Sequence, residues 1–162
     1  MFDLKKLNNI NSKYLKNMKL EEIYKLIIKF FNLKLNIYQE KRLKSLLPEL
    51  LKRINIFTDI KDDIEWIIND NFICSEKDTV LKLRNENSLL NDLSSLLNKC
   101  KWTKVDIENC LKQYMIEKSL EFKDIGPILR IALTGKTNSP DLISIIHELG
   151  CAITLNRLNY KY

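Results

Sequence analysis

Residues 126–142, with the sequence GPILRIALTGKTNSPDL, hold the side chains of this chain best suited to bind an anion or a nucleic acid. Arg130 stands in an apolar run, so its guanidinium either forms a salt bridge or presents a rigid fork of donors to a ligand. Ser139-Pro140 is a typical helix start, and a helix N-terminus has free N–H groups that can hold a phosphate or the acceptor edge of a base. This stretch therefore predicts a binding site.

The residues that catalysis requires do not form a recognisable pattern. Gly135-Lys136-Thr137 has the residue types that end a phosphate-binding loop, but Arg130 stands where that motif needs a glycine, and no buried strand precedes it. The single histidine, His147, has no partner pattern for a catalytic triad or a metal site. Paired acids such as Asp62-Asp63 lie in first turns of predicted helices, where the helix dipole favours them. The sequence predicts no active site.

The cysteines and the N-terminus indicate the cellular environment. None of the four cysteines forms a CxxC pair, so we expect no metal site and reduced, mostly buried thiols at Cys74, Cys100, Cys110 and Cys151. The N-terminus lacks the apolar segment of a signal peptide, and no apolar run approaches the roughly 20 residues that span a bilayer. The sequence predicts a cytoplasmic protein without a membrane partner.

The charge balance leaves two interpretations open. The net charge of +6 favours a polyanionic partner. However, the chain is rich in Lys, Asn and Ile, as is typical of AT-rich genes, and its 22 lysines greatly outnumber its 5 arginines.

The hydrophobic pattern predicts helices joined by short polar loops. Three glycines and three prolines are too few for the turns of a β-sandwich or barrel. Apolar stripes with helical spacing predict helices over residues 2–16, 20–31, 37–47, 58–68, 75–84, 87–99, 104–119, 128–134 and 140–149, with a last helix carrying Leu155 and Leu158. The loop signal at Asn69–Asn71 predicts a boundary. We therefore expect an all-α fold of two packed helical subdomains, residues 1–70 and 71–162.

Particular residues predict where helices begin and end. Pro48 either kinks its helix or starts the next one. Pro127 suits the first position of a helix, and Gly135 a left-handed terminator. Ser139 is predicted as an N-cap with Pro140 as the first helical residue.

Several blocks resemble the C-terminal end of bacterial glutamyl-tRNA synthetases. They are PILRIALTG at 127–135, SPDL at 139–142, ELG at 148–150, Arg157-Leu158, FDLKKLNNINSKYLKNM at 2–18, LLPELLKR at 46–53 and KWT at 101–103. The resemblance covers essentially the whole chain in collinear order, and the ALTG block is its most specific part.

The resemblance implies the anticodon-binding part of a glutamate–tRNA ligase, an all-helical cage. In this family that part grips the anticodon stem and the splayed anticodon bases, so residues 1–70 are expected to contact both and residues 71–162 the anticodon. The family's catalytic signatures are absent, so the resemblance implies no catalysis, cofactor or metal in this chain. ATP is used by the full-length enzyme. The implied partners are tRNA(Glu) and the ligase's own catalytic domain, in a monomer.

The resemblance also assigns site residues. Arg53 matches an arginine that reads the third anticodon base. Four further residues match positions that line the anticodon pocket, namely Arg130, Ser139, Pro140 and Leu142. The family more often has another residue at position 139, so backbone is an alternative contact there. Candidates for phosphate contacts are Lys52, Lys136 and Arg157.

The chemistry of Arg53 predicts which tRNA is accepted. The third base is cytosine in a glutamate anticodon and guanine in a glutamine anticodon. Arginine has only donors, which match the adjacent acceptors of cytosine and oppose the donors of guanine. A good bidentate contact discriminates by about 1–3 kcal/mol. Arg53 therefore predicts rejection of glutamine tRNA.

Two other functions are compatible with the helical pattern. Apolar stripes fit any bundle, including a protein–protein adaptor. The two short helices on either side of Lys136–Asn138 also have the outline of a helix-turn-helix DNA-binding module.

Overall fold

The structure, a computed structural model, describes residues 15, 17–54 and 56–162. These residues form eight α-helices and one 3-10 helix and contain no β-strand, which confirms the all-α prediction for the described part of the chain. The predicted helix over residues 2–16 lies outside the described residues, Leu15 excepted.

The chain divides into two compact units, residues 1–68 and 69–162. The division falls two residues before the boundary expected between residues 70 and 71. The roles assigned to the two parts stay predictions.

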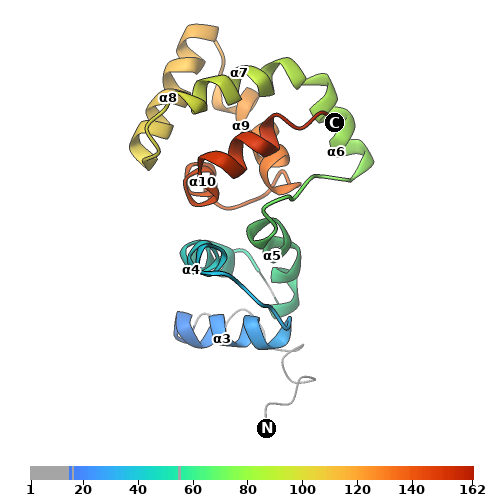
Figure 1. Ribbon diagram of the computed structural model, residues 1–162, viewed down its shortest axis with the longest axis vertical. Coiled ribbons are helices and arrows are strands. Elements are labelled where there is room, and N and C mark those ends of the chain that lie inside the picture. The colour runs from blue at the N-terminus through green and yellow to red at the C-terminus, as the bar shows by residue number, and fades with distance from the viewer. Residues whose placement is uncertain (1–14, 16, 55) are drawn as a thin grey trace. The chain divides into compact units, whose positions relative to one another are not determined.

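Unit 1 contains four helical elements: α3 (Leu20–Phe30), α4 (Ile37–Leu51), η1 (Phe57–Ile60) and α5 (Lys61–Ile68) (Figure 1). Helix α4 packs against both α3 and α5. The helices share a core of fully buried side chains, among them Ile23, Ile27, Leu43, Leu46, Leu47, Phe57, Trp66 and Ile67. This burial of apolar side chains is the main stabilising term of the unit.

Helix α4 continues past Pro48 and is therefore longer than expected. The helix continues to Leu51, so Pro48 does not start a new helix. Proline has no N–H to donate to the carbonyl of Lys44, and tertiary packing offsets that loss, since the leucines on either side are buried. At its start, the Asn36 side chain accepts the N–H groups of Tyr38 and Gln39 at 2.9 and 3.0 Å.

Unit 2 is built around its last helix. Its helices are α6 (Lys77–Asn85), α7 (Asn87–Asn98), α8 (Lys104–Lys118), α9 (Phe122–Thr134) and α10 (Leu142–Leu158). Helix α10 contacts α7, α8 and α9 (Figure 1). The core of the unit includes Leu83, Leu90, Leu93, Leu97, Ile107, Leu129, Leu133, Leu142, Ile145 and Ile146.

Helix α9 starts five residues before the predicted position, so the placement of Pro127 at the first position of a helix is wrong. The N-cap is Glu121, whose N–H donates to Asp124 Oδ2 at 2.7 Å. An N3 acid that bonds back to the N-cap is one half of a capping box, and this signal outweighs the proline. A Cβ at Gly126 would lie 2.7 Å from the Phe122 ring, so a larger residue there would require this exposed ring to move.

Two glycines end helical segments in this part of unit 2. Gly135 ends α9 with a left-handed φ of 73°. Gly150 has φ 79° and ψ 166°, so α10 consists of two helical segments that meet at this residue. The predicted end of a helix at Gly150 and the last helix beyond it are therefore confirmed.

Replacing Gly150 by alanine tests the backbone requirement alone, because an added Cβ meets nothing within 4 Å. Only glycine adopts this φ/ψ region without strain, so Gly150→Ala should lower the free energy of unfolding by about 1–3 kcal/mol. Urea denaturation measures the loss. Asn156→Ala, at an exposed position of the same helix, is the control and should change stability by less than about 0.5 kcal/mol. Equal stability of Gly150→Ala and wild type would contradict the strain.

Candidate nucleic-acid interface

Residues 135–141, here called the α9–α10 corner, join the two longest apolar segments of unit 2. The corner begins with a hydrogen-bonded turn: Gly135 N–H donates to Ile131 O at 2.8 Å. Thr134 Oγ1 donates to Arg130 O at 2.8 Å and accepts the N–H of Lys136 at 3.2 Å. These bonds occupy backbone groups that the end of a helix leaves unpaired.

Arg130 holds the other side of the corner. Its Nη1 donates to the carbonyl oxygen and the hydroxyl of Ser139, both at 2.9 Å, and to the carbonyl oxygen of Pro140. The arginine is half-buried. A planar guanidinium suits this task because its donors have fixed directions. The partner of the arginine in the apolar run is thus the backbone of the corner itself.

The predicted helix start at Ser139 is wrong by two residues. The N-cap of α10 is Asp141, whose Oδ2 accepts the N–H of Ser144 at 2.8 Å. Ser139 and Pro140 lie before the helix because Arg130 binds their backbone oxygens. The first turn of α10 therefore holds a carboxylate of its own, where an open anion site was expected.

The predicted pocket residues of the corner are buried. Ser139 is 3% exposed and Leu142 is fully buried, and Pro140 is buried as well. The structure thus brings Arg130, Ser139, Pro140 and Leu142 together at one corner, but it presents other side chains to the solvent. Thr137 and Asn138 are exposed, and Lys136 is half-buried. Thr137 and Asn138 were not among the predicted site residues, although a polar loop between two apolar helices is the signal for them.

A groove of about 320 Å³ lies beside the corner, between its turn and α6. Its lining combines two lysines and a carboxylate with hydroxyl, amide and apolar groups, from Glu76, Thr79, Lys82, Ile131, Gly135, Lys136, Thr137 and Asn138. Charges of both signs therefore border the groove, and its two lysines are the groups suited to a phosphate.

Arg53 and Lys52 lie in unit 1, in the turn that follows α4, and both are exposed. Arg53 N–H donates to Leu50 O at 3.0 Å, which fixes the turn. Lys52 Nζ lies 3.1 Å from Glu49 Oε1, a surface ion pair of small energetic value. The exposure of Arg53 agrees with a role in reading a base, which stays a prediction.

Arg157 is not on the surface, so the expectation that it contacts a phosphate is corrected. It is 2% exposed. Its Nη1 donates to Leu133 O, and its Nη2 donates to Asn69 O at 2.8 Å. A buried guanidinium already bonded to backbone carbonyls is not available to the phosphates of a ligand.

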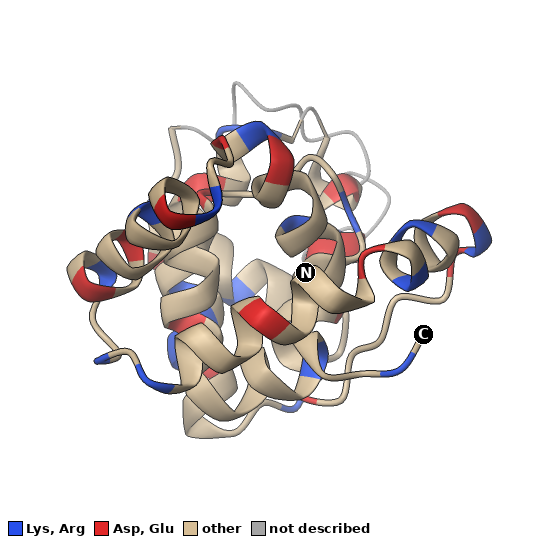
Figure 2. Cartoon of the chain, turned by 90° about the horizontal axis from the view of Figure 1, so that it is seen from above, with Lys and Arg blue, Asp and Glu red and all other residues tan. Residues whose placement is uncertain are grey.

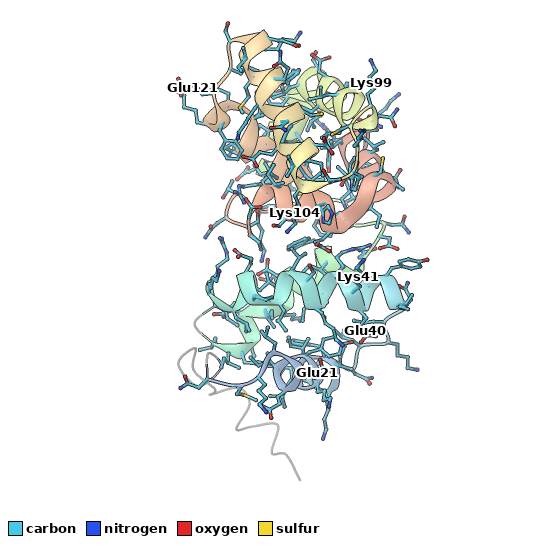
Figure 3. The ribbon with its side chains drawn as sticks, turned by 90° about the vertical axis from the view of Figure 1, so that its left-hand side faces the viewer. Glu21, Glu40, Lys41, Lys99, Lys104 and Glu121 are labelled. Atoms are coloured by element: carbon cyan, nitrogen blue, oxygen red, sulfur yellow. The ribbon has the colours of Figure 1, made fainter. Side chains whose placement is uncertain are left out.

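Charges of both signs are distributed over the same helices (Figure 2). Lys104, at the start of α8 (Figure 3), donates to Ser144 Oγ at 3.0 Å and so ties α8 to the first turn of α10. Glu21 on α3 and Glu40 on α4 (Figure 3) both lie near Lys44, at 3.5 and 2.9 Å. Hydrogen bonding to Lys44 lowers the pKa of Glu40. These contacts connect neighbouring helices within each unit.

The described residues contain no group of three or more His, Cys, Asp or Glu side chains that could hold a metal ion. The four cysteines are free thiols. Burial, and then the neighbouring Cys110, raises the pKa of Cys100 to about 12, which is the opposite of what a nucleophilic thiolate requires. No helix in the described part of the chain has the length and apolar character needed to cross a membrane.

Residues 21–161 match the family described as the anticodon binding domain. The chain belongs to this family. Among curated relatives, glutamate–tRNA ligases of Tropheryma whipplei (strain Twist) and Thermus thermophilus are each 28% identical to it. They cover 97% and 98% of this chain, and the matched part is 33% and 34% of their own length. The chain thus spans about a third of these relatives and corresponds to their anticodon-binding part, not to the catalytic part.

Solved structures show the same fold. A glutamate tRNA ligase from Elizabethkingia meningosepticum CCUG26117 aligns with a TM-score of 0.72 and 19% identity, over 92% of this chain and 30% of that one. Glutamate-tRNA synthetase from Elizabethkingia anophelis aligns with a TM-score of 0.68 and 21% identity, over 98% and 31%. The anticodon-binding domain of this chain therefore has the helical fold of those ligases.

Removing the guanidinium of Arg130 should loosen the corner. In Arg130→Met the oxygens of Ser139 and Pro140 lose their donor, so the segment opens more often and trypsin should cleave after Lys136 several-fold faster. Mass spectrometry of the fragments measures this rate, with cleavage after Lys52 in unit 1 as the internal reference. Arg84→Met, which removes an exposed arginine on α6, should leave both rates unchanged. An unchanged rate at Lys136 in Arg130→Met would show that the hydrogen bonds of Arg130 do not hold the corner.

Proposed function

We propose that this anticodon-binding domain recognises the anticodon of tRNA(Glu) as part of a glutamate–tRNA ligase. The observation that carries the proposal is the match to the anticodon-binding family over residues 21–161. The relatives that align with nearly the whole chain are glutamate–tRNA ligases, which supports the same function. The net charge of +6 supports a polyanionic partner. The ligase attaches glutamate to the tRNA with ATP, and the domain selects which tRNA is charged.

The domain works together with the catalytic domain of the ligase, in a cytoplasmic monomer. Its own contribution is binding, because the chain matches the anticodon-binding part of its relatives and not their catalytic part. Anticodon contacts made far from the chemistry then raise the affinity for the correct tRNA.

Arg53 reads the third anticodon base in this proposal. Its exposed position after α4 gives the guanidinium access to an unstacked base. The donors of the guanidinium satisfy the pairing-edge acceptors of cytosine, whereas the donors of guanine would face them unsatisfied. Selection against glutamine tRNA follows from this difference.

The α9–α10 corner contributes the second contact region. Its oxygens are held in place by Arg130, while Thr137, Asn138 and Lys136 border the adjacent groove. Preorganised backbone and short polar side chains suit single-stranded bases, which expose their hydrogen-bonding edges once they are unstacked. In this arrangement Arg130 supports the surface that the anticodon meets, Lys52 and Lys136 contact phosphates, and Ser139, Pro140 and Leu142 shape the pocket from below.

The packing of α10 argues against the helix-turn-helix alternative. A recognition helix needs an exposed face that enters the major groove. Helix α10 contacts α7, α8 and α9, and its buried residues occur along its whole length. A protein–protein adaptor has no comparable observation in its favour.

Anticodon recognition predicts a preference that a binding assay detects. At low salt the chain should bind tRNA(Glu) transcripts at least about fivefold more tightly than a transcript with an altered anticodon, since each wrong base costs about 1–3 kcal/mol. Duplex DNA should bind more weakly than either. Gel shifts with protein in excess measure these affinities. Equal affinity for the native and altered anticodons would contradict the proposed function.

Arg53→Gln should relax discrimination at the third base specifically. Glutamine offers both donors and acceptors, so the preference for cytosine over guanine at this position should fall by about 1–3 kcal/mol, or roughly 5–150-fold. Gel shifts with tRNA(Glu) and with its C-to-G variant give the ratio of dissociation constants. Lys52→Gln removes a neighbouring charge and is the matched control, which should weaken both complexes equally. A ratio unchanged in Arg53→Gln would assign base reading to another residue.

A further inference from the structure

Arg157 joins three segments that are distant in the sequence. It lies in the last turn of α10 and is 2% exposed. Its Nη1 donates to Leu133 O, near the end of α9. Its Nη2 donates to Asn69 O, at the start of unit 2, at 2.8 Å. The guanidinium carbon lies 5.2 Å from the centre of the Phe72 ring. Such a geometry allows a cation–π contact in addition to the hydrogen bonds.

The same Phe72 ring also supports the turn that ends α9. A Cβ added to Gly135 would lie 3.1 Å from Phe72 Cζ, so the ring closely approaches the backbone of this glycine. Arg157 therefore acts on the end of α9 in two ways. It bonds directly to the carbonyl of Leu133, and it contacts the ring against which Gly135 rests.

These contacts hold the start of the α9–α10 corner, where Gly135 follows α9. Arg130 holds the end of the corner through its hydrogen bonds to Ser139 and Pro140. A short segment that is held at both ends loses few conformations when a ligand binds to it, which strengthens specific binding. Arg130 itself lies on α9. Any movement of the end of this helix would therefore also displace the guanidinium that binds Ser139 and Pro140.

We infer that Arg157 is a positioning residue for anticodon recognition: it holds the end of α9 and Phe72, and through them the geometry of the corner that meets the RNA. The inference rests on the proposed function and deepens it. Arg157 does not touch the RNA, because its guanidinium is buried and bonded to backbone oxygens. Its replacement should therefore impair selection of the anticodon and leave the general attraction to phosphates intact.

The test compares three variants with wild type in binding to tRNA(Glu) and to an anticodon-altered transcript, at several salt concentrations and well below each melting temperature. In Arg157→Leu the affinity ratio of the two transcripts should fall towards one, while affinity for the altered transcript and the salt slope stay unchanged. Arg157→Lys should give an intermediate ratio, since an ammonium can reach only part of the fork's acceptors. Arg84→Leu removes an exposed arginine and should keep the wild-type ratio.

Two outcomes of the binding assay would overturn the inference. A phosphate contact predicts equal weakening for both transcripts and a salt slope shallower by about 0.7–0.9. A purely structural role predicts a lower melting temperature with an unchanged ratio in the folded protein. Should Arg157→Leu not fold, Phe72→Leu disturbs the same support without removing a charge, and it should likewise lower the ratio.

A second readout separates this inference from the proposed function. Tryptic cleavage after Lys136 requires no RNA and should be faster in Arg157→Leu than in wild type, as in Arg130→Met. Faster cleavage with no anticodon preference in the wild-type chain would retain the positioning role and reject the proposed ligand. Cleavage at the wild-type rate would reject the positioning role whatever the RNA data show.

Discussion

Guanidinium groups that bind backbone carbonyl oxygens hold the α9–α10 end of unit 2 together. Arg130 binds the oxygens of Ser139 and Pro140, and Arg157 binds those of Leu133 and Asn69. Hydrogen bonds to a charged donor contribute about 1.5–3 kcal/mol, and a buried carbonyl left without a partner costs about 1–3 kcal/mol. Arg42 makes the same kind of bond in unit 1, to Ile67 O at 2.6 Å.

Because Arg130 binds the backbone of the corner, it supports the candidate site from within. The proposed binding surface is a corner whose buried residues give it shape and whose exposed residues, Thr137 and Asn138 with half-buried Lys136, border the groove. A site of this kind depends on residues behind it as much as on those in contact with the ligand. Anticodon recognition by a helical domain fits it well, because unstacked bases require fixed partners and not a flexible, uniformly charged surface.

The sequence predicted the features that local chemistry determines. Gly135 ends α9 with a positive φ as expected, and the helix predicted over residues 140–149 ends where expected, at Gly150. Two predictions failed because a residue outside the local segment competes with the local signal. Ser139-Pro140 has the composition of a helix start, yet its oxygens accept hydrogen bonds from Arg130. The helix begins after Asp141 instead, which is its N-cap. The burial of Arg157 depends on Asn69, 88 residues away, a contact that no spacing rule reveals.

The internal use of arginine also has a consequence for the chemistry of the surface. Of the 5 arginines, only Arg53 and Arg84 are exposed, whereas the chain has 22 lysines. Its outward positive charge therefore resides almost entirely in primary amines. Acetylation of those amines would remove most of the attraction between this surface and RNA. The arginine bonds that maintain the corner involve none of these amines and would survive such a modification. The net charge of the acetylated chain would be negative, because its 5 arginines would stand against 21 acidic residues.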